Sequence, residues 1–321
     1  MRPALLFCLV LRALFQNTEI RADSSHPNLR GYLSAHDPST ITQCKDRYYI
    51  FWTGPNILSK SSSDKMFWSP GPRVFTNAPA WTTNLVPGFA GIFWAPDLLF
   101  FNGQYHLYYA VSTFGSQVSA IGMASNPTLD PADPAYHWTD MGMIIRSTNG
   151  SPYNTIDPCL TWDNAGNLWL AFGSYWSGIY ITQLDPVTGL RITPTSPTYQ
   201  LAYNSSIEAA YIYRHGAYYY LFVNWGSCCS GVNSTYNIRV GRSKTITGPY
   251  LDKDGRDMMK DAGTPLLDSD GAFIGPGHAG VLVQGERFLL SMHFYDGTHN
   301  GQSMLAIREL KWDTEGWPVV K

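Results

Sequence analysis

One short pattern recurs five times along the chain, and it limits the possible folds more than any other feature. Each copy begins with a polar or charged residue beside small residues or proline, passes through a turn, and ends in a run rich in aromatic and aliphatic residues. Such runs favour β-strands. The copies occupy residues 36–39, 94–97, 156–159, 207–210 and 277–280, and their β-rich runs begin at residues 48, 105, 168, 218 and 288.

The spacing of the copies predicts the architecture. Equivalent positions recur every 50 to 70 residues or so, roughly the length of a four-stranded propeller blade with its loops. A single Asp-Pro pair only indicates that a strand or turn begins, but five copies in phase predict an all-β, five-bladed β-propeller. The first strand of each blade lines the axis of such a fold. We therefore expect five residues to share one region: Asp37, Asp97, Asp157, Glu208 and His278.

Composition agrees with one turn-rich β domain that binds a neutral ligand. The 29 glycines and 21 prolines are spread along the whole chain, and no linker divides residues 25–321. The formal net charge is only −2 and no basic stripe accompanies the aromatic residues, which argues against nucleic acid as a partner. The 11 Trp and 20 Tyr suit carbohydrate binding, because sugar C–H faces pack on aromatic rings, but they also suit packing between blades.

The N-terminus has the pattern of a secretory signal. A charged start at Arg2 precedes the apolar run Ala4–Leu11, which is too short to span a bilayer, and Arg12 then interrupts it. We assign residues 1–24 to this signal, with an uncertain boundary, and expect a secreted, extracellular protein. No other apolar segment is long enough to cross a membrane, so no membrane partner is expected.

Four cysteines remain after the signal. Cys44 and Cys159 stand alone, and Cys228-Cys229 is an adjacent pair. No C-x-x-C spacing is present, so structural zinc is not expected. The adjacent pair is compatible with a disulfide that stiffens its loop and equally with two reduced thiols. The sequons at Asn204 and Asn233 are candidate glycan sites in a eukaryotic host.

The motifs in order resemble those of the glycoside hydrolases of family 43, and within them the arabinan endo-1,5-α-L-arabinanases. The resemblance extends from Leu29 to Val320 and implies a five-bladed β-propeller, in agreement with the repeat count. The motifs that carry it are Asp37-Pro38, Trp94-Ala95-Pro96-Asp97, Tyr109–Gly115, Ile156-Asp157-Pro158 and Glu208-Ala209.

The resemblance implies three catalytic acids: Asp37 as the general base, Glu208 as the general acid, and Asp157 as the group that orients the acid and raises its pKa. Such a set has a physical reason. Inverting hydrolysis needs one protonated and one ionised carboxyl, roughly 6.5–9.5 Å apart so that a water fits between them. A third negative charge nearby makes the acid harder to ionise. Asp97 is not among the three, and we expect it to be structural or to support the site.

The resemblance also implies binding residues. Trp94 and Phe114 correspond to a sugar platform and Trp176 is a further candidate, although each could instead pack between blades. His278 corresponds to a ligand of one calcium ion on the propeller axis; because calcium prefers oxygen, water and carboxylates would complete that site. Arg239 would lie near the catalytic carboxylates or on a blade surface.

The sequence thus predicts a secreted, monomeric enzyme that cleaves internal α-1,5-L-arabinofuranosidic bonds of arabinan, the pectin side chain, or of arabino-oligosaccharides. Two enzyme alternatives stay open, an exo-acting α-L-arabinofuranosidase and a β-xylosidase. An alternative of another class is a non-catalytic sugar-binding propeller. The presence of all three acids favours catalysis.

Overall fold

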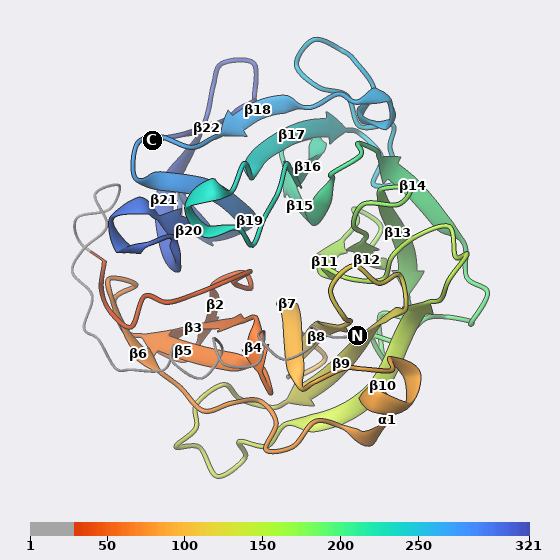
Figure 1. The fold of residues 1–321 in the computed structure, drawn as a ribbon, viewed down its shortest axis with the longest axis vertical. Helices are drawn as coiled ribbons and strands as arrows, with labels where there is room; N and C mark the ends of the chain where they lie inside the picture. The colour runs from red at the N-terminus through yellow and green to blue at the C-terminus, as the bar shows by residue number, and fades with distance from the viewer. Residues whose placement is uncertain (1–28) are drawn as a thin grey trace, which may run out of the picture.

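The computed structural model describes residues 29–321, in which five sheets stand around a central axis as the blades of a propeller (Figure 1). The prediction of an all-β, five-bladed β-propeller is confirmed. The predicted secretory signal, residues 1–24, lies outside the described residues. No helix among the described residues is long and apolar enough to cross a membrane.

The blades follow one another in chain order. Blade one contains β1 (Arg30–Gly31), β2 (Thr42–Cys44), β3 (Arg47–Trp52), β5 (Leu58–Ser62) and β6 (Phe67–Pro70). Blade two contains β4 (Gly54–Pro55), β7 (Ile92–Phe101), β8 (Gln104–Val111), β9 (Ser119–Asn126) and β10 (Thr139–Ser147). Blade three contains β11 (Cys159–Trp162), β12 (Leu168–Phe172), β13 (Ile179–Leu184) and β14 (Thr198–Ala202).

Blades four and five have four strands each. Blade four contains β15 (Glu208–His215), β16 (Tyr218–Trp225), β17 (Asn237–Ser243) and β18 (Thr264–Leu267). Blade five contains β19 (Phe273–Gln284), β20 (Arg287–Asp296), β21 (Gln302–Trp312) and β22 (Pro318–Val320). The short helices of the described chain are α1 (Ala80–Leu85) and the 3-10 turns η1 (Gly231–Asn233), η2 (Met258–Lys260) and η3 (Gly297–His299).

The five β-rich runs of the sequence form the second strand of each blade: β3, β8, β12, β16 and β20. In blade two the turn at Asn102-Gly103 joins the first strand to the second, and both residues have positive φ, 49° and 76°. Two-residue hairpins use such turns because their twist matches that of the strands. The second strands are largely buried, as in β8, where seven consecutive residues from Tyr105 to Val111 are buried. A strand whose sheet is covered on both faces has a continuous run of apolar residues, whereas a strand with one exposed face alternates apolar and polar residues.

The ring closes between blades five and one. The backbone N–H of Ala35 donates to the carbonyl of Ser303 (3.1 Å), and the N–H of Leu305 donates to the carbonyl of Leu33 (2.8 Å). The segment before the first copy of the repeated motif is therefore bonded to the start of β21.

The repeated motif has a backbone signature. Five non-glycine residues have φ in the left-handed region at the axial end of successive blades: Asp37 (47°), Ala95 (43°), Asp157 (56°), Ala209 (54°) and His278 (61°). Strand register shifts at this place in blades two, four and five, as at a β-bulge. Counted along the backbone, Asp97 follows this position by two residues and Glu208 precedes it by one. The five residues expected to be equivalent therefore are not.

Candidate active site

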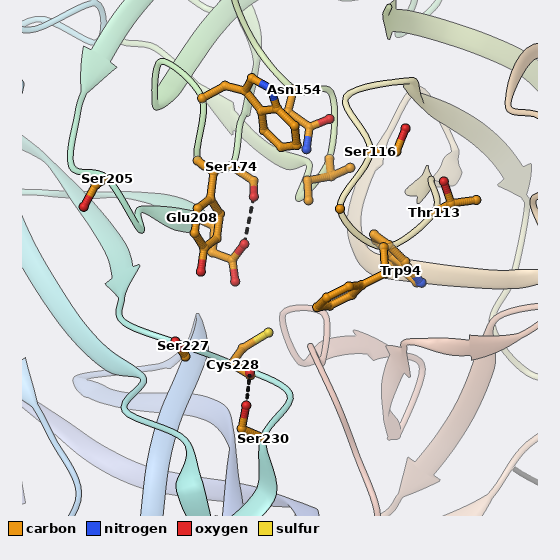
Figure 2. A pocket seen from close by; sticks show the side chains of 15 residues that line it. Trp94, Thr113, Ser116, Asn154, Ser174, Ser205, Glu208, Ser227, Cys228 and Ser230 are labelled. Carbon is orange, nitrogen blue, oxygen red and sulfur yellow. Dashed lines mark hydrogen bonds between the residues drawn. The ribbon is translucent and has the colours of Figure 1, made fainter. Parts of the chain in front are cut away.

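A cavity of about 580 Å³ opens between the loops of blades two, three and four. Its lining includes Trp94, Ser174 and Glu208, and also Cys228 from the loop after β16 (Figure 2). These residues come from sequence positions far apart, and the propeller brings them to one hollow. Lining of this kind, apolar rings with a few polar groups, is typical of a small-molecule site.

Glu208, the first residue of β15, projects its carboxyl into this cavity. Its Oε2 accepts a hydrogen bond from the Ser174 hydroxyl (2.8 Å), and its Oε1 accepts one from the Tyr236 hydroxyl (2.9 Å). Burial raises the pKa of Glu208 to about 7; the two hydroxyl donors oppose this rise and the charge of Asp37 adds to it. Glu208 is therefore protonated in weakly acidic solution, as a general acid must be.

Asp157 lies beside Glu208 and is buried. Its Oδ2 accepts a hydrogen bond from the backbone N–H of Ala209 (2.9 Å), the residue after Glu208. Burial raises the pKa of Asp157 well above its usual value, and the charges of Glu208 and Asp37 raise it further. One proton shared within this acidic pair costs less than two buried charges.

Asp37 has the opposite environment. Three imidazole nitrogens lie near its carboxylate: His36 Nε2 at 3.4 Å, His278 Nδ1 at 3.6 Å and His293 Nδ1 at 3.4 Å. The Thr53 hydroxyl donates to Oδ2 (3.0 Å). Burial alone would raise the pKa of Asp37, but these histidines and the hydroxyl outweigh it and lower the pKa to about 2. Asp37 is thus ionised where Glu208 is protonated. The site holds an acid and a base at one pH, the requirement for acid–base hydrolysis.

The histidines around Asp37 form a buried group near the axis that could hold a metal ion. One candidate set of ligand atoms joins His36, Asp37 and His293. Burial lowers the pKa of His278, and the charge of Asp37 partly opposes this shift. The Nδ1 of His293 accepts the Asp37 N–H (3.1 Å), so Nε2 carries the proton; this buried atom has no partner among the described residues. A donor aimed at no protein acceptor suits an ion that keeps water ligands, so the group fits a hydrated calcium.

A second candidate set for a metal joins His36 to the sulfurs of Cys228 and Cys229. The structure shows a disulfide between these two cysteines, which resolves the alternatives left by the sequence. Since the thiolate is the form that binds metal, this set carries no metal in the oxidised protein.

The aromatic candidates all reach the cavity. Trp94, Phe114 and Trp176 belong to its lining, and Phe114 is 87% exposed while Trp176 is 44% exposed. An aromatic side chain that packed between blades would be buried, so the structure favours their availability to a ligand.

Asp97 and Arg239 lie apart from this chemistry. Asp97 is buried and accepts the backbone N–H groups of Thr40 (3.4 Å) and Leu160 (3.0 Å), which ties blade two to blades one and three. Arg239 donates to Asn237 and to the carbonyl of Gly263, and its guanidinium stacks on the Trp225 ring. Within residues 29–321, these contacts of Arg239 involve none of the catalytic candidates. The contacts of Asp97 are those of a structural residue, one of the two roles that the sequence left open for it.

Sequence reasoning missed the groups that support the three acids. Ser174 and Tyr236 bond to Glu208, and Thr53 and His293 bond to Asp37. Each comes from a segment with no acidic motif of its own. Ser174 and Tyr236 lie in loops that follow the second strand of their blades, and such loops converge at one end of a propeller. Their place in the repeat was therefore the one feature of the sequence that could have indicated them.

Comparisons with known proteins agree with this geometry. A family model described as glycosyl hydrolases family 43 matches residues 31–318. The extracellular endo-α-(1->5)-L-arabinanase 1 of Bacillus subtilis is 43% identical over 291 residues, which cover 88% of this chain and 86% of the relative. The extracellular exo-α-(1->5)-L-arabinofuranosidase ArbA of Cellvibrio japonicus is 40% identical over 301 residues, covering 90% and 86%.

A solved structure is also similar. It is the α-L-arabinanase of Cellvibrio cellulosa complexed with arabinohexaose, which superposes with a TM-score of 0.86 at 39% sequence identity. The match covers 90% of this chain and 96% of that one. The fold and 90% of the length of this chain are therefore shared with an arabinanase whose structure was solved in complex with arabinohexaose.

Proposed function

This chain belongs to glycosyl hydrolase family 43, and from that premise we propose that it is a secreted arabinanase that cleaves internal α-1,5-L-arabinofuranosidic bonds with inversion. One observation carries the proposal: Asp37 and Glu208 are close enough for the charge of Asp37 to act on Glu208, and their pKa values move in opposite directions. A non-catalytic sugar-binding propeller would need no such pair.

The acids have complementary roles. The Glu208 carboxyl gives its proton to the glycosidic oxygen as the C1–O bond breaks, and the Asp37 carboxylate takes a proton from the water that attacks C1 from the opposite face. The sugar leaves with inverted configuration, Glu208 is left ionised and Asp37 protonated, and solvent restores both. Asp157, bonded to the N–H of Ala209, holds the Glu208 backbone and disfavours loss of its proton beforehand.

The substrate is held by stacking. Trp94, Phe114 and Trp176 line the cavity and offer ring faces to the C–H faces of arabinofuranose units. The relative solved with arabinohexaose supports a linear oligosaccharide as the ligand. Extracellular relatives and the apolar run Ala4–Leu11 support secretion.

We assign His278 as a protein ligand of one calcium ion, with water as the remaining ligands. A bound calcium would supply positive charge beside Asp37, which favours the ionised base. The base is already ionised through its histidine neighbours, so no step of the mechanism above depends on the ion.

Product sizes on linear α-1,5-arabinan test internal cleavage. The endo mode predicts a ladder of oligosaccharides in the first minutes and a fast loss of polymer length. Exo action is the second candidate, because a relative with 40% identity is named an exo-enzyme. Free arabinose or one fixed short oligomer from the start would contradict endo cleavage and support exo action.

A further inference from the structure

Cys228, one half of the Cys228–Cys229 disulfide, lines the cavity, although no catalytic role requires it. The disulfide lies in the loop between β16 and β17, and Cys228 lines the same cavity as Trp94 and Glu208. Figure 2 shows the Cys228 side chain pointing into the open space that the carboxyl of Glu208 and the Trp94 ring also face. The sulfur therefore lies where a sugar bound between these residues would be.

The loop is fixed at several points. The N–H of Cys229 donates to the Tyr295 hydroxyl in blade five (2.7 Å), and the Ser230 hydroxyl donates to the carbonyl of Cys228 (3.1 Å). The N–H of Gly226 donates to the Ser206 hydroxyl before β15 (3.0 Å). Bonds to both sides of the loop keep the disulfide in place, so it presents a constant surface to a ligand.

The chemistry of a disulfide suits this place better than that of two thiols. Disulfide sulfurs are polarisable and carry no proton, so they contact C–H groups as a soft apolar surface. The Cys229 Sγ is 3.6 Å from His36 Nε2, which is itself 3.4 Å from Asp37 Oδ2. In the disulfide the two sulfurs are bonded to each other and carry no proton, and His36 lies beside Asp37.

We propose that the Cys228–Cys229 disulfide is a specificity-determining contact, a fixed apolar wall across the cleft from Trp94 that packs against the C–H face of a sugar near the cleaved linkage. This inference deepens the proposed function and rests on it, because the sugar is an arabinofuranose unit of that substrate. The disulfide binds substrate in this role and takes no part in proton transfer.

The test compares the enzyme with a Cys228→Ser/Cys229→Ser variant on linear α-1,5-arabinohexaose. The variant replaces the apolar wall with hydroxyls that stay neutral, so KM rises roughly three- to tenfold, the scale of one sulfur contact, while kcat stays within about twofold. Val232→Ser is the matched control: it lies in the same loop, is 49% exposed and does not line the cavity, and it leaves KM unchanged.

Reduction supplies a second measurement on the unmutated protein. Treatment with a phosphine reductant raises the wild-type KM, reoxidation with oxidised glutathione restores it, and the double-serine variant responds to neither. The described chain also holds Cys44 and Cys159 as buried free thiols, which a reductant leaves as they are.

Two outcomes would overturn the inference while leaving the proposed function intact. One is an unchanged KM in the double-serine variant of an enzyme that cleaves arabinohexaose. The other is a double-serine variant with an unchanged KM, a lowered Tm and a kcat that falls in proportion to the Tm. That result would mean that the disulfide only stabilises the loop. A wild-type enzyme that leaves arabinohexaose uncut contradicts the proposed function itself, and the inference falls with it.

Discussion

Asp37 and Glu208 share one site yet differ in protonation, because different neighbours surround them. Asp37 faces three histidines and the Thr53 hydroxyl, whereas Glu208 is buried near two other carboxyls. The difference follows from placement alone, since both side chains end in the same group. Each can be tested through its effect on the pH dependence of the reaction.

The pH profile of kcat/KM should be wide on the acid side and end near neutrality. Glu208 must be protonated, so activity falls as pH rises through its raised pKa of about 7. Asp37 must be ionised, so activity is lost only as pH falls toward its lowered pKa of about 2. Because Glu208 and Asp157 interact strongly, the fall in kcat/KM at alkaline pH reports the titration of the pair rather than of Glu208 alone. Initial rates from about pH 3 to about pH 9 measure it, and full activity at the alkaline end would contradict the assignment.

Tyr236→Phe should move the alkaline limb upward. The Tyr236 hydroxyl donates to Glu208 Oε1 and lowers the pKa of Glu208. A hydrogen bond to a charged group contributes about 1.5–3 kcal/mol, so its loss raises the limb by about one pH unit or more. Tyr213→Phe, at a half-buried tyrosine in the outer part of β15, is the control and should leave the profile in place. A limb that stays fixed in Tyr236→Phe would contradict the role of this hydroxyl.

At the scale of single residues, the repeated motif singled out three acids as candidates, but the sequence did not reveal their hydrogen-bond partners. Asp37, Asp157 and Glu208 stand in repeated motifs, so their convergence followed from the propeller itself. Ser174 and Tyr236 reach Glu208 from different loops, and no spacing in the chain encodes a contact between side chains that only the folded ring brings together.

The axial ends of the inner strands explain why the repeated motif needed correction. The left-handed residue is Asp37 in blade one and Asp157 in blade three, but Ala209 in blade four. In a strand, a shift of one residue points a side chain to the other face. Glu208 precedes the left-handed position and lines the cavity, whereas Asp37 occupies that position and is not among the residues that line the cavity. The sequence shows five similar copies of the motif. The backbone dihedral angles decide which residue of one copy is structurally equivalent to which residue of the next.

Asp97→Ala should destabilise the ring without removing catalysis. It would leave the buried N–H of Leu160 without its acceptor and remove the longer, part-buried bond from Thr40. At about 1–3 kcal/mol for an unsatisfied buried group, we expect a loss of about 1–3 kcal/mol in the free energy of unfolding. Urea denaturation measures this loss, and Glu286→Ala in an exposed turn is the control. A stable variant with lost kcat would show that Asp97 acts in the reaction instead.

The whole molecule depends on closing the ring, which the repeat count alone does not reveal. Five repeats of similar length predict five blades. This number is correct because each repeat forms one sheet of its own. Two backbone hydrogen bonds join segments from the two ends of the described chain: Ala35 bonds to Ser303, and Leu305 bonds to Leu33. Contacts between residues so far apart leave no local pattern, so the number of blades can be predicted from the repeats but the manner of closure cannot.

Calcium removal should act on stability as well as activity. If His278 helps to hold the ion near Asp37, a chelator lowers Tm and activity, and added calcium restores both. At a calcium concentration of about 100 times Kd, binding contributes about 2.7 kcal/mol to the free energy of unfolding. His278→Ala should show the lower Tm with or without chelator. If neither chelator nor added calcium changes the Tm of the wild-type protein, the proposed calcium site is contradicted.

The stereochemistry of the first product tests the central claim most directly, because it reports how Asp37 and Glu208 are placed around one linkage. Proton NMR of arabinohexaose hydrolysis, recorded before the anomers equilibrate, distinguishes the two configurations at the new reducing end. Attack by a water that Asp37 activates, opposite the bond that Glu208 protonates, predicts the β-anomer first. Initial release of the α-anomer would mean a covalent intermediate on one carboxylate and would contradict this account of the site.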